Sequence, residues 1–210
     1  EKEQALELLG GAHGASDLLR AECHHELGIV KRMLGDPRGA RDELWRAQVL
    51  ASRDGHESEL RVAIMSSLAL LDRSLGAAPG ARANFEEAME IMGRVGSQLH
   101  PRYALILRNL ASLANAEGGF SEAEDLYKRA LAILESTVGP DHPDVAATRL
   151  GLGNALKELR RYAEAREQYN RAISIHRETL GTEAPALAID YHNLAGLLLQ
   201  EGDREGAMEY

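Results

Sequence analysis

The chain has a single cysteine, few aromatic residues and no long apolar run. Because Cys23 has no second cysteine to pair with, an intrachain disulfide is excluded, which is typical of a protein from a reducing compartment. Aromatic residues make up 4% of the sequence, so the core must consist of Leu, Ala, Ile and Val. We find neither an apolar run of about 18 residues nor a signal-peptide pattern. We therefore expect a cytoplasmic protein without a membrane partner.

Positive charge is also scarce. Lys and Arg number 24 against 33 Asp and Glu, so the net charge of the 210 residues is −9. This balance excludes the broad basic surface that nucleic-acid-binding proteins use, and we expect no nucleic-acid partner. With 44% hydrophobic and 27% charged residues, the Ala- and Leu-rich composition favours packed helices over sheets.

Small and large residues recur in fixed columns every 41 or 42 positions. The first column is Ala40, Ala81, Ala123, Ala165 and Ala207. The second is Ala5, Ala47, Ala88, Ala130 and Ala172. The third is Leu27, Leu68, Leu110, Leu152 and Leu194, each followed by Gly or Ala. The fourth is Leu44, Phe85, Tyr127 and Tyr169. Columns that share one register indicate a repeated structural unit.

Each unit has the pattern of two amphipathic helices joined by a tight turn. Apolar residues follow i, i+3, i+4 spacing on both sides of a turn glycine, for example before and after Gly118. The turn position holds Gly35, Gly76, Gly118 and Gly202, and Arg160 breaks the series. The pattern predicts helices over 1–9, 17–34, 37–53, 57–75, 78–94, 100–117, 120–136, 142–159, 162–178, 184–201 and 204–210.

These columns resemble the tetratricopeptide repeat. That family has Leu followed by a small residue, and then Ala, an aromatic and Ala, as Leu110-Ala111, Ala123, Tyr127 and Ala130 do here. The 42-residue period and the connecting segments "HPRYA" and "HPDVA" resemble the kinesin light chain subtype. The resemblance implies an all-α, right-handed α-solenoid of antiparallel helix pairs. It covers the whole chain, although Leu44 stands where an aromatic is expected and "GAAPGA" interrupts the second unit's turn.

We expect one solenoid over residues 1–210. Its parts are the end of a preceding repeat (1–15), four repeats (16–56, 57–98, 99–141 and 142–183) and a truncated fifth (184–210). Both ends match interior repeats, because Ala5 lies 42 positions before Ala47 and the sequence stops within a second-helix pattern. We therefore expect a piece of a longer protein that could self-associate through exposed solenoid ends.

No residue pattern predicts catalysis, a cofactor or a metal. Cys23, His24 and His25 are adjacent on a predicted helix, where neighbouring side chains point about 100° apart and cannot chelate one ion, so we predict a buried thiol and two surface imidazoles. The "GLG" at 151–153 lies inside a helix with no strand before it and is interpreted as close helix packing. His100 and His142 precede prolines and are predicted to be helix-entry residues. We expect a protein that is not an enzyme.

The resemblance further implies that the first helix of each pair lines a concave groove that binds a peptide or partner protein. Mapped onto this sequence, the lining positions are Glu22, His25, Ile29, Arg32 and Met33; Ala63, Ser66, Leu70, Arg73 and Ser74; Leu105, Arg108, Ser112, Asn115 and Ala116; Ala147, Leu150, Asn154, Lys157 and Glu158; and Ile189, His192, Gly196, Leu199 and Gln200.

The mapped lining differs in charge from the rest of the chain. One column reads Arg32, Arg73, Asn115 and Lys157, and Arg108 lies nearby, so four cations face two anions. We predict an acidic or phosphorylated partner segment. The alternative is that cations on these helices only serve solubility. The resemblance implies that Asn109, Asn154 and Asn193 bond the peptide backbone, whereas local turns or water could also satisfy them.

Two other functions stay open at this point. The chain could be the regulatory or sensor arm of a larger signalling enzyme whose catalytic domain lies elsewhere. It could also be a self-assembly module that stacks through its ends or its convex face. A receptor for C-terminal carboxylates is disfavoured, because Leu150 occupies the lysine position of the carboxylate clamp that some members of this family use.

Overall fold

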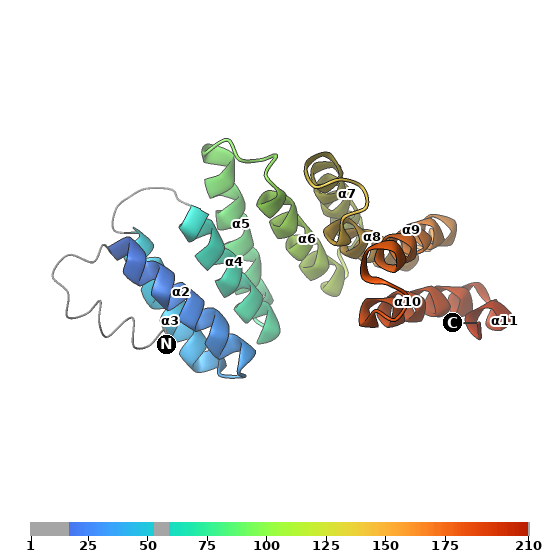
Figure 1. The fold of residues 1–210 in the computed structure, drawn as a ribbon, viewed down its shortest axis with the longest axis horizontal. Helices are drawn as coiled ribbons and strands as arrows, with labels where there is room; N and C mark the ends of the chain where they lie inside the picture. Colours follow the sequence, from blue (N-terminus) through green and yellow to red (C-terminus); the bar gives the residue numbers. More distant parts are fainter. Residues whose placement is uncertain (1–16, 53–58, 210) are drawn as a thin grey trace. The chain divides into compact units, whose positions relative to one another are not determined.

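The structure is a computed structural model that describes residues 17–52 and 59–209. Within these residues the regular elements are all α-helices, which confirms the predicted all-α class. The chain divides into two compact units, Glu1–Gln98 and Leu99–Tyr210. Figure 1 shows the helices with their labels. The helix predicted over 1–9 lies outside the described residues.

The first unit contains two helix pairs. Its helices are α2 (Asp17–Met33), α3 (Pro37–Ser52), α4 (Glu59–Ser74) and α5 (Ala78–Arg94). Helix α2 packs on α3 and α4 packs on α5, while α3 and α2 both contact α4. The second unit continues the same scheme. Its helices are α6 (Pro101–Ala116), α7 (Phe120–Thr137), α8 (Pro143–Glu158), α9 (Tyr162–Leu180), α10 (Pro185–Glu201) and α11 (Arg204–Ala207).

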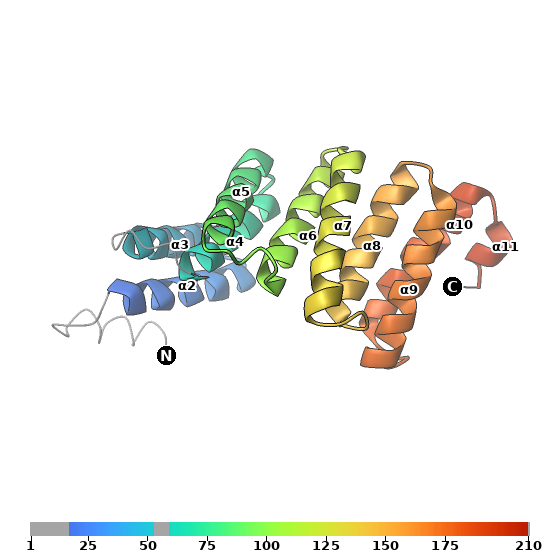
Figure 2. The same cartoon turned by 90° about the horizontal axis from the view of Figure 1, so that it is seen from above.

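Within the second unit every helix packs on the next one along the chain. The first helices of successive pairs also touch, α6 on α8 and α8 on α10. Figure 2 shows α6 beside α7 and α8 beside α9. Apart from the short α11, the observed helix bounds lie within two residues of the predicted ones. None of the described helices combines the length and the apolar character that crossing a membrane would require.

The repeat columns form the core. The first two alanine columns are fully buried from Ala40 to Ala172, and the leucine column is at most 8% exposed. Where the small residue after the leucine is glycine, it lies against the larger fourth-column residue of the same pair. A Cβ atom on Gly28 would lie 2.7 Å from Cγ of Leu44, and one on Gly153 would lie 2.5 Å from Cε1 of Tyr169. These contacts confirm the interpretation of "GLG" as close helix packing at Gly153.

The turn inside each pair has one backbone geometry. The turn position has a positive φ in every described pair, and Arg160 adopts it as well, with φ 61°. The next residue then donates its N–H to a carbonyl five positions back, as Ala77 does to Asp72 and Arg161 to Leu156. Two of the loops between pairs end in a side-chain cap. Nδ1 of His100 and of His142 accepts the backbone N–H of Arg102 and of Asp144, both at 3.1 Å, so these histidines are helix-entry residues as predicted.

Candidate peptide-binding face

The lining positions predicted on the first helices form the candidate site, and we call them the first-helix face of each unit. In the first unit they lie on α2 and α4, and in the second on α6, α8 and α10. Of the mapped positions only His25 is buried, and the others are half-buried or exposed. Most side chains at these positions are therefore not packed into the core between the helices.

Arg32 and Arg73 are the cations of the first unit's face. They occupy the last turns of α2 and α4, which contact each other. Arg73 is exposed and Arg32 is half-buried, and within residues 17–52 and 59–209 neither forms an ion pair. A cation near a helix C-terminus also interacts favourably with the helix dipole, by about 0.3–1 kcal/mol. Helix stability therefore contributes to the preference for Arg here. The interaction with the dipole still leaves both guanidinium groups available to a ligand.

The prediction for Cys23, His24 and His25 was wrong in its details. His25 is buried, and its Nε2 lies 2.9 Å from Oγ of Ser67 on α4. His24 is largely covered as well, with Nδ1 2.6 Å from Oε2 of Glu43 on α3. Cys23 is half-buried rather than buried. Two adjacent histidines on one helix thus face two different neighbours, α3 and α4, and both serve packing.

Glu43 is a buried carboxylate surrounded by donors. Besides His24, it accepts Nζ of Lys31 at 2.9 Å and Nη1 of Arg46 at 3.4 Å. Burial acts to raise the pKa of Glu43, but the hydrogen bonds from Lys31 and His24 outweigh it, so the pKa lies below its ordinary value. The carboxylate therefore stays ionised at neutral pH and ties α2 to α3.

In the second unit, Arg108 is not a free cation. Its Nη1 donates to Oδ1 of Asp144 at 2.7 Å, joining α6 to α8. Lys157 lies 3.8 Å from Glu158 on its own helix, and its side chain is 18% exposed. Each predicted cation of this face thus has an anion beside it. Asp144 was missed because it lies 36 positions from Arg108, and only the packing of α6 on α8 brings the two together.

The asparagines of the face differ in their surroundings. Oδ1 of Asn154 accepts the hydroxyl of Tyr169 at 2.7 Å, so this amide is oriented by the helix pair itself. Burial raises the pKa of Tyr169, and the charge of Glu158 acts in the same direction, which keeps the phenol protonated. Oδ1 of Asn115 is buried and has no hydrogen-bond partner among the described residues. Asn109 and Asn193 are half-buried, and His192 is exposed.

Two buried polar groups near these helices were not predicted. Arg149 of α8 donates to Oε1 of Gln168 at 2.8 Å and to Glu135, and burial lowers its pKa. Nδ1 of His176 lies 2.7 Å from Oδ2 of Asp190 between α9 and α10. The sequence did hold a signal, because Asp190 stands in a column otherwise occupied by Cys23, Ile64, Ile106 and Thr148. Both groups hold helices together.

The described residues contain no group of three or more His, Cys, Asp or Glu side chains that could hold a metal ion.

Comparison with known proteins settles the class of the repeat. A profile of the tetratricopeptide repeat matches residues 60–136, 102–178 and 144–210, which together span most of the chain. The chain belongs to the tetratricopeptide repeat family. No sequence match was found among curated proteins.

Solved structures agree with this family. BtubC (BKLC) from P. vanneervenii is 24% identical, with a TM-score of 0.84 over 99% of this chain and 83% of that one. A putative kinesin light chain from Podospora anserina, with nearly identical repeats, is 25% identical, with a TM-score of 0.76 over 94% of this chain and 93% of that one. RapI in its apo form shares 13% identity and a TM-score of 0.76 over 90% of this chain and 67% of that one.

These similarities confirm the predicted all-α repeat solenoid and its kinesin light chain-like character. Tetratricopeptide repeat proteins are generally non-catalytic scaffolds that bind proteins or peptides, and this agrees with the predicted class of function.

Proposed function

We propose that this chain binds an acidic segment of a partner protein along its first-helix faces. The observation that carries the proposal is the state of Arg32 and Arg73, which lie on adjoining helices without an ion pair in the described part of the chain. Two unpaired guanidinium groups on one face of a chain with net charge −9 favour a ligand of negative charge.

The second unit contributes a different kind of contact. With Arg108 paired to Asp144, its face offers apolar side chains and amides rather than net charge. Ile189 is 63% and Leu199 57% exposed on α10. The half-buried amides of Asn109 and Asn193 offer donors and acceptors with which a peptide backbone could pair. We propose that the second unit's face holds a ligand through apolar anchors and backbone hydrogen bonds, whereas the first unit's face, taken by itself, selects negative charge.

The strength of an exposed ion pair and the spacing between helices indicate how long the ligand must be. An exposed ion pair contributes about 0.2–1 kcal/mol, so two arginines alone cannot hold a peptide. Adjacent helices lie roughly 8–10 Å apart, and an extended peptide advances about 3.3 Å per residue. Carboxylates about three residues apart in the ligand would therefore meet Arg32 and Arg73 in turn. We expect a segment that combines acidic residues with several apolar ones.

The test is a charge reversal with a matched control. A peptide array identifies acidic binders, and their affinity for the Arg32→Glu/Arg73→Glu double variant is then measured by fluorescence anisotropy. We expect a loss of about tenfold or more, because two attractions become repulsions. Arg129→Glu/Arg171→Glu is the control, since both residues are exposed on second helices, α7 and α9, and the change in net charge is the same.

An equal loss in both double variants would show that only the total charge matters and would overturn the proposed face. Unchanged affinity in the Arg32→Glu/Arg73→Glu variant would do the same. A mass that rises with protein concentration, together with an array that yields no binder, would favour the alternative role as a self-assembly module.

A further inference from the structure

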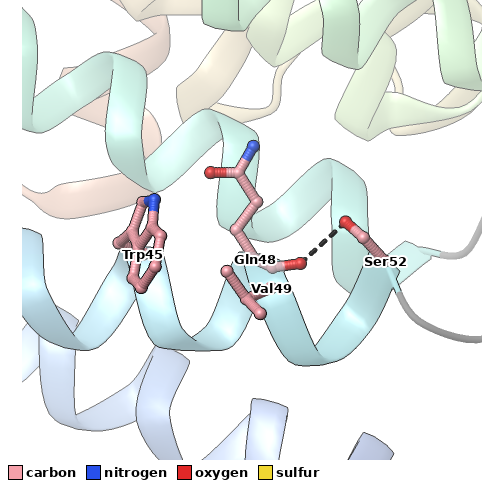
Figure 3. A pocket seen from close by; sticks show the side chains of 4 residues that line it. All are labelled: Trp45, Gln48, Val49 and Ser52. Atoms are coloured by element: carbon pink, nitrogen blue, oxygen red, sulfur yellow. Dashed lines mark hydrogen bonds between the residues drawn. The ribbon is translucent and has the colours of Figure 1, made fainter.

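Trp45 is the chain's single tryptophan, and it lies on the surface of a second helix. Its side chain is 61% exposed, and Val49, one turn further along α3, is 36% exposed. With Gln48 and Ser52 they line an open hollow of about 400 Å³. In Figure 3 these side chains stand on one side of α3. We call Trp45, Gln48, Val49 and Ser52 the α3 patch.

The repeat does not require apolar residues at these positions. The column of Trp45 holds Glu86, Lys128 and Asn170 in the other second helices, and that of Val49 holds Glu90, Ala132 and Ser174. The residues of α3 that pack inward are different ones, including Ala40, Leu44 and Ala47, all fully buried. The fold therefore accepts polar residues where α3 presents tryptophan and valine, so packing does not explain this pair.

The charges around the patch limit what can cover it. The exposed charged side chains of α3 are Arg38, Arg41, Asp42 and Arg46, a positive balance in a chain of net charge −9. Arg41 bonds Asp72 at 2.9 Å and Arg46 bonds Glu43 at 3.4 Å, but a guanidinium has five N–H donors and these contacts leave several unused. A second copy of α3 would bring like charges together, whereas an acidic segment would meet complementary ones.

We propose that the α3 patch is a second docking surface, which takes an acidic segment of a partner protein through one apolar anchor. The anchor side chain sits in the hollow beside Trp45 and Val49, and carboxylates on either side pair with Arg38 and Arg46. Trp and Arg dominate the energetic centres of protein interfaces because they combine apolar contact with directed polar contact. This surface lies on a second helix and does not depend on the first-helix face.

The single tryptophan makes the test specific, because tryptophan emission, excited at a wavelength where the six tyrosines do not absorb, reports on α3 alone. The probe is a short peptide of glutamate and serine with one central leucine. We expect it to shift the Trp45 emission to shorter wavelength in a saturable way, as the anchor displaces water. Two matched peptides, one with lysine in place of glutamate and one with serine in place of leucine, should leave the emission unchanged.

The variants follow from the repeat itself. Val49→Glu keeps the reporter and copies the residue found at Glu90, so the fold should tolerate it. We expect it to weaken the response to the glutamate–leucine probe by about tenfold or more. Ala132→Glu adds the same charge in the same column of α7 and should have no effect. Arg32→Glu/Arg73→Glu should also leave the response intact, because those residues belong to the other face.

Several results would overturn the proposal. These are an emission that does not respond to the glutamate–leucine probe, an equal response to either matched peptide, and a Val49→Glu protein that responds like the wild type. An emission shift that follows protein concentration without any peptide would show instead that a second copy covers the patch.

Discussion

Arg160 occupies a backbone position that glycine holds in the other helix pairs. Its φ of 61° lies in the left-handed region, where a Cβ costs roughly 1–2 kcal/mol. We expect Arg160→Gly to raise the free energy of unfolding by up to about 1 kcal/mol, because the greater freedom of glycine in the unfolded chain offsets part of the relief. Urea denaturation followed by circular dichroism measures the change.

Gly118 offers the reciprocal experiment. It has φ 84° and open space where its Cβ would be, so Gly118→Arg changes the backbone preference without a clash. This variant should lose about as much stability as a left-handed Cβ costs, roughly 1–2 kcal/mol. If Arg160→Gly were neutral while Gly118→Arg was destabilising, interactions of the Arg160 side chain would have to compensate for its backbone strain.

The columns could predict Arg160 as the exception, but not the surroundings of His24 and His25. That adjacent helical residues diverge by about 100° was enough to exclude chelation by the pair. It was not enough to place them at the surface, because which neighbours a helix meets depends on the packing of its pair and of the next one. Glu43 and Ser67, the partners found in the structure, lie 19 and 42 positions away.

At the scale of the helix pair, Gly153 controls how closely α8 and α9 approach. Its added Cβ would meet the ring of Tyr169, which is itself fully buried and bonded to Asn154. We expect Gly153→Ala to lower the free energy of unfolding by about 1–3 kcal/mol through overpacking, despite the better helix propensity of alanine. The measurement is chemical denaturation followed by the circular dichroism signal of the helices.

Gly196 is the matched control on α10. It is also inside a first helix, but no atom lies within 4 Å of the place its Cβ would take. Gly196→Ala should therefore stabilise the protein by about 0.5–1 kcal/mol, since only the helix propensity changes. Opposite signs for the two substitutions are the expected result. A similar loss at both positions would contradict the assignment of the Gly153 effect to the ring of Tyr169.

The helix bounds were predictable because each pair contains residues that are typical of helix starts and helix ends. A turn residue with positive φ ends the first helix, and proline begins most first helices after the loop, as Pro101, Pro143 and Pro185 do. Buried polar pairs were less visible. Arg149 and Asp190 have their partners, Glu135 and His176, on the preceding second helix. A single sequence can show that a residue is unusual for its column, but it does not show which residue that side chain contacts.

For the molecule as a whole, the sequence predicted the cations of the first-helix face but not their neutralisation. Four cations in the mapped lining favoured an acidic partner in a chain of net charge −9. In the structure only Arg32 and Arg73 still support an acidic partner. Asp144 forms an ion pair with Arg108, and Glu158 lies beside Lys157. The balance of charge on a face depends on which helices touch, and periodicity alone does not give it.

This balance can be altered by one substitution. Asp144→Asn removes the anion that holds Arg108, so the second unit's face gains one unpaired cation. If the ligand passes over this face, its affinity should rise about two- to fivefold, the equivalent of an exposed ion pair of roughly 0.2–1 kcal/mol. The gain should disappear near ~1 M salt, where the Debye length falls to about 3 Å.

Two controls make the result specific to this face. Asp125→Asn on α7 changes the net charge by the same amount at an exposed position away from the first helices, and it should leave the affinity unchanged. Asp144 also lies in the first turn of α8, so its loss should cost about 0.3–1 kcal/mol of stability, which a melting curve records separately. An equal gain for both variants would trace the attraction to the charge of the whole chain, whereas no gain for either would place the ligand's acidic groups away from Arg108.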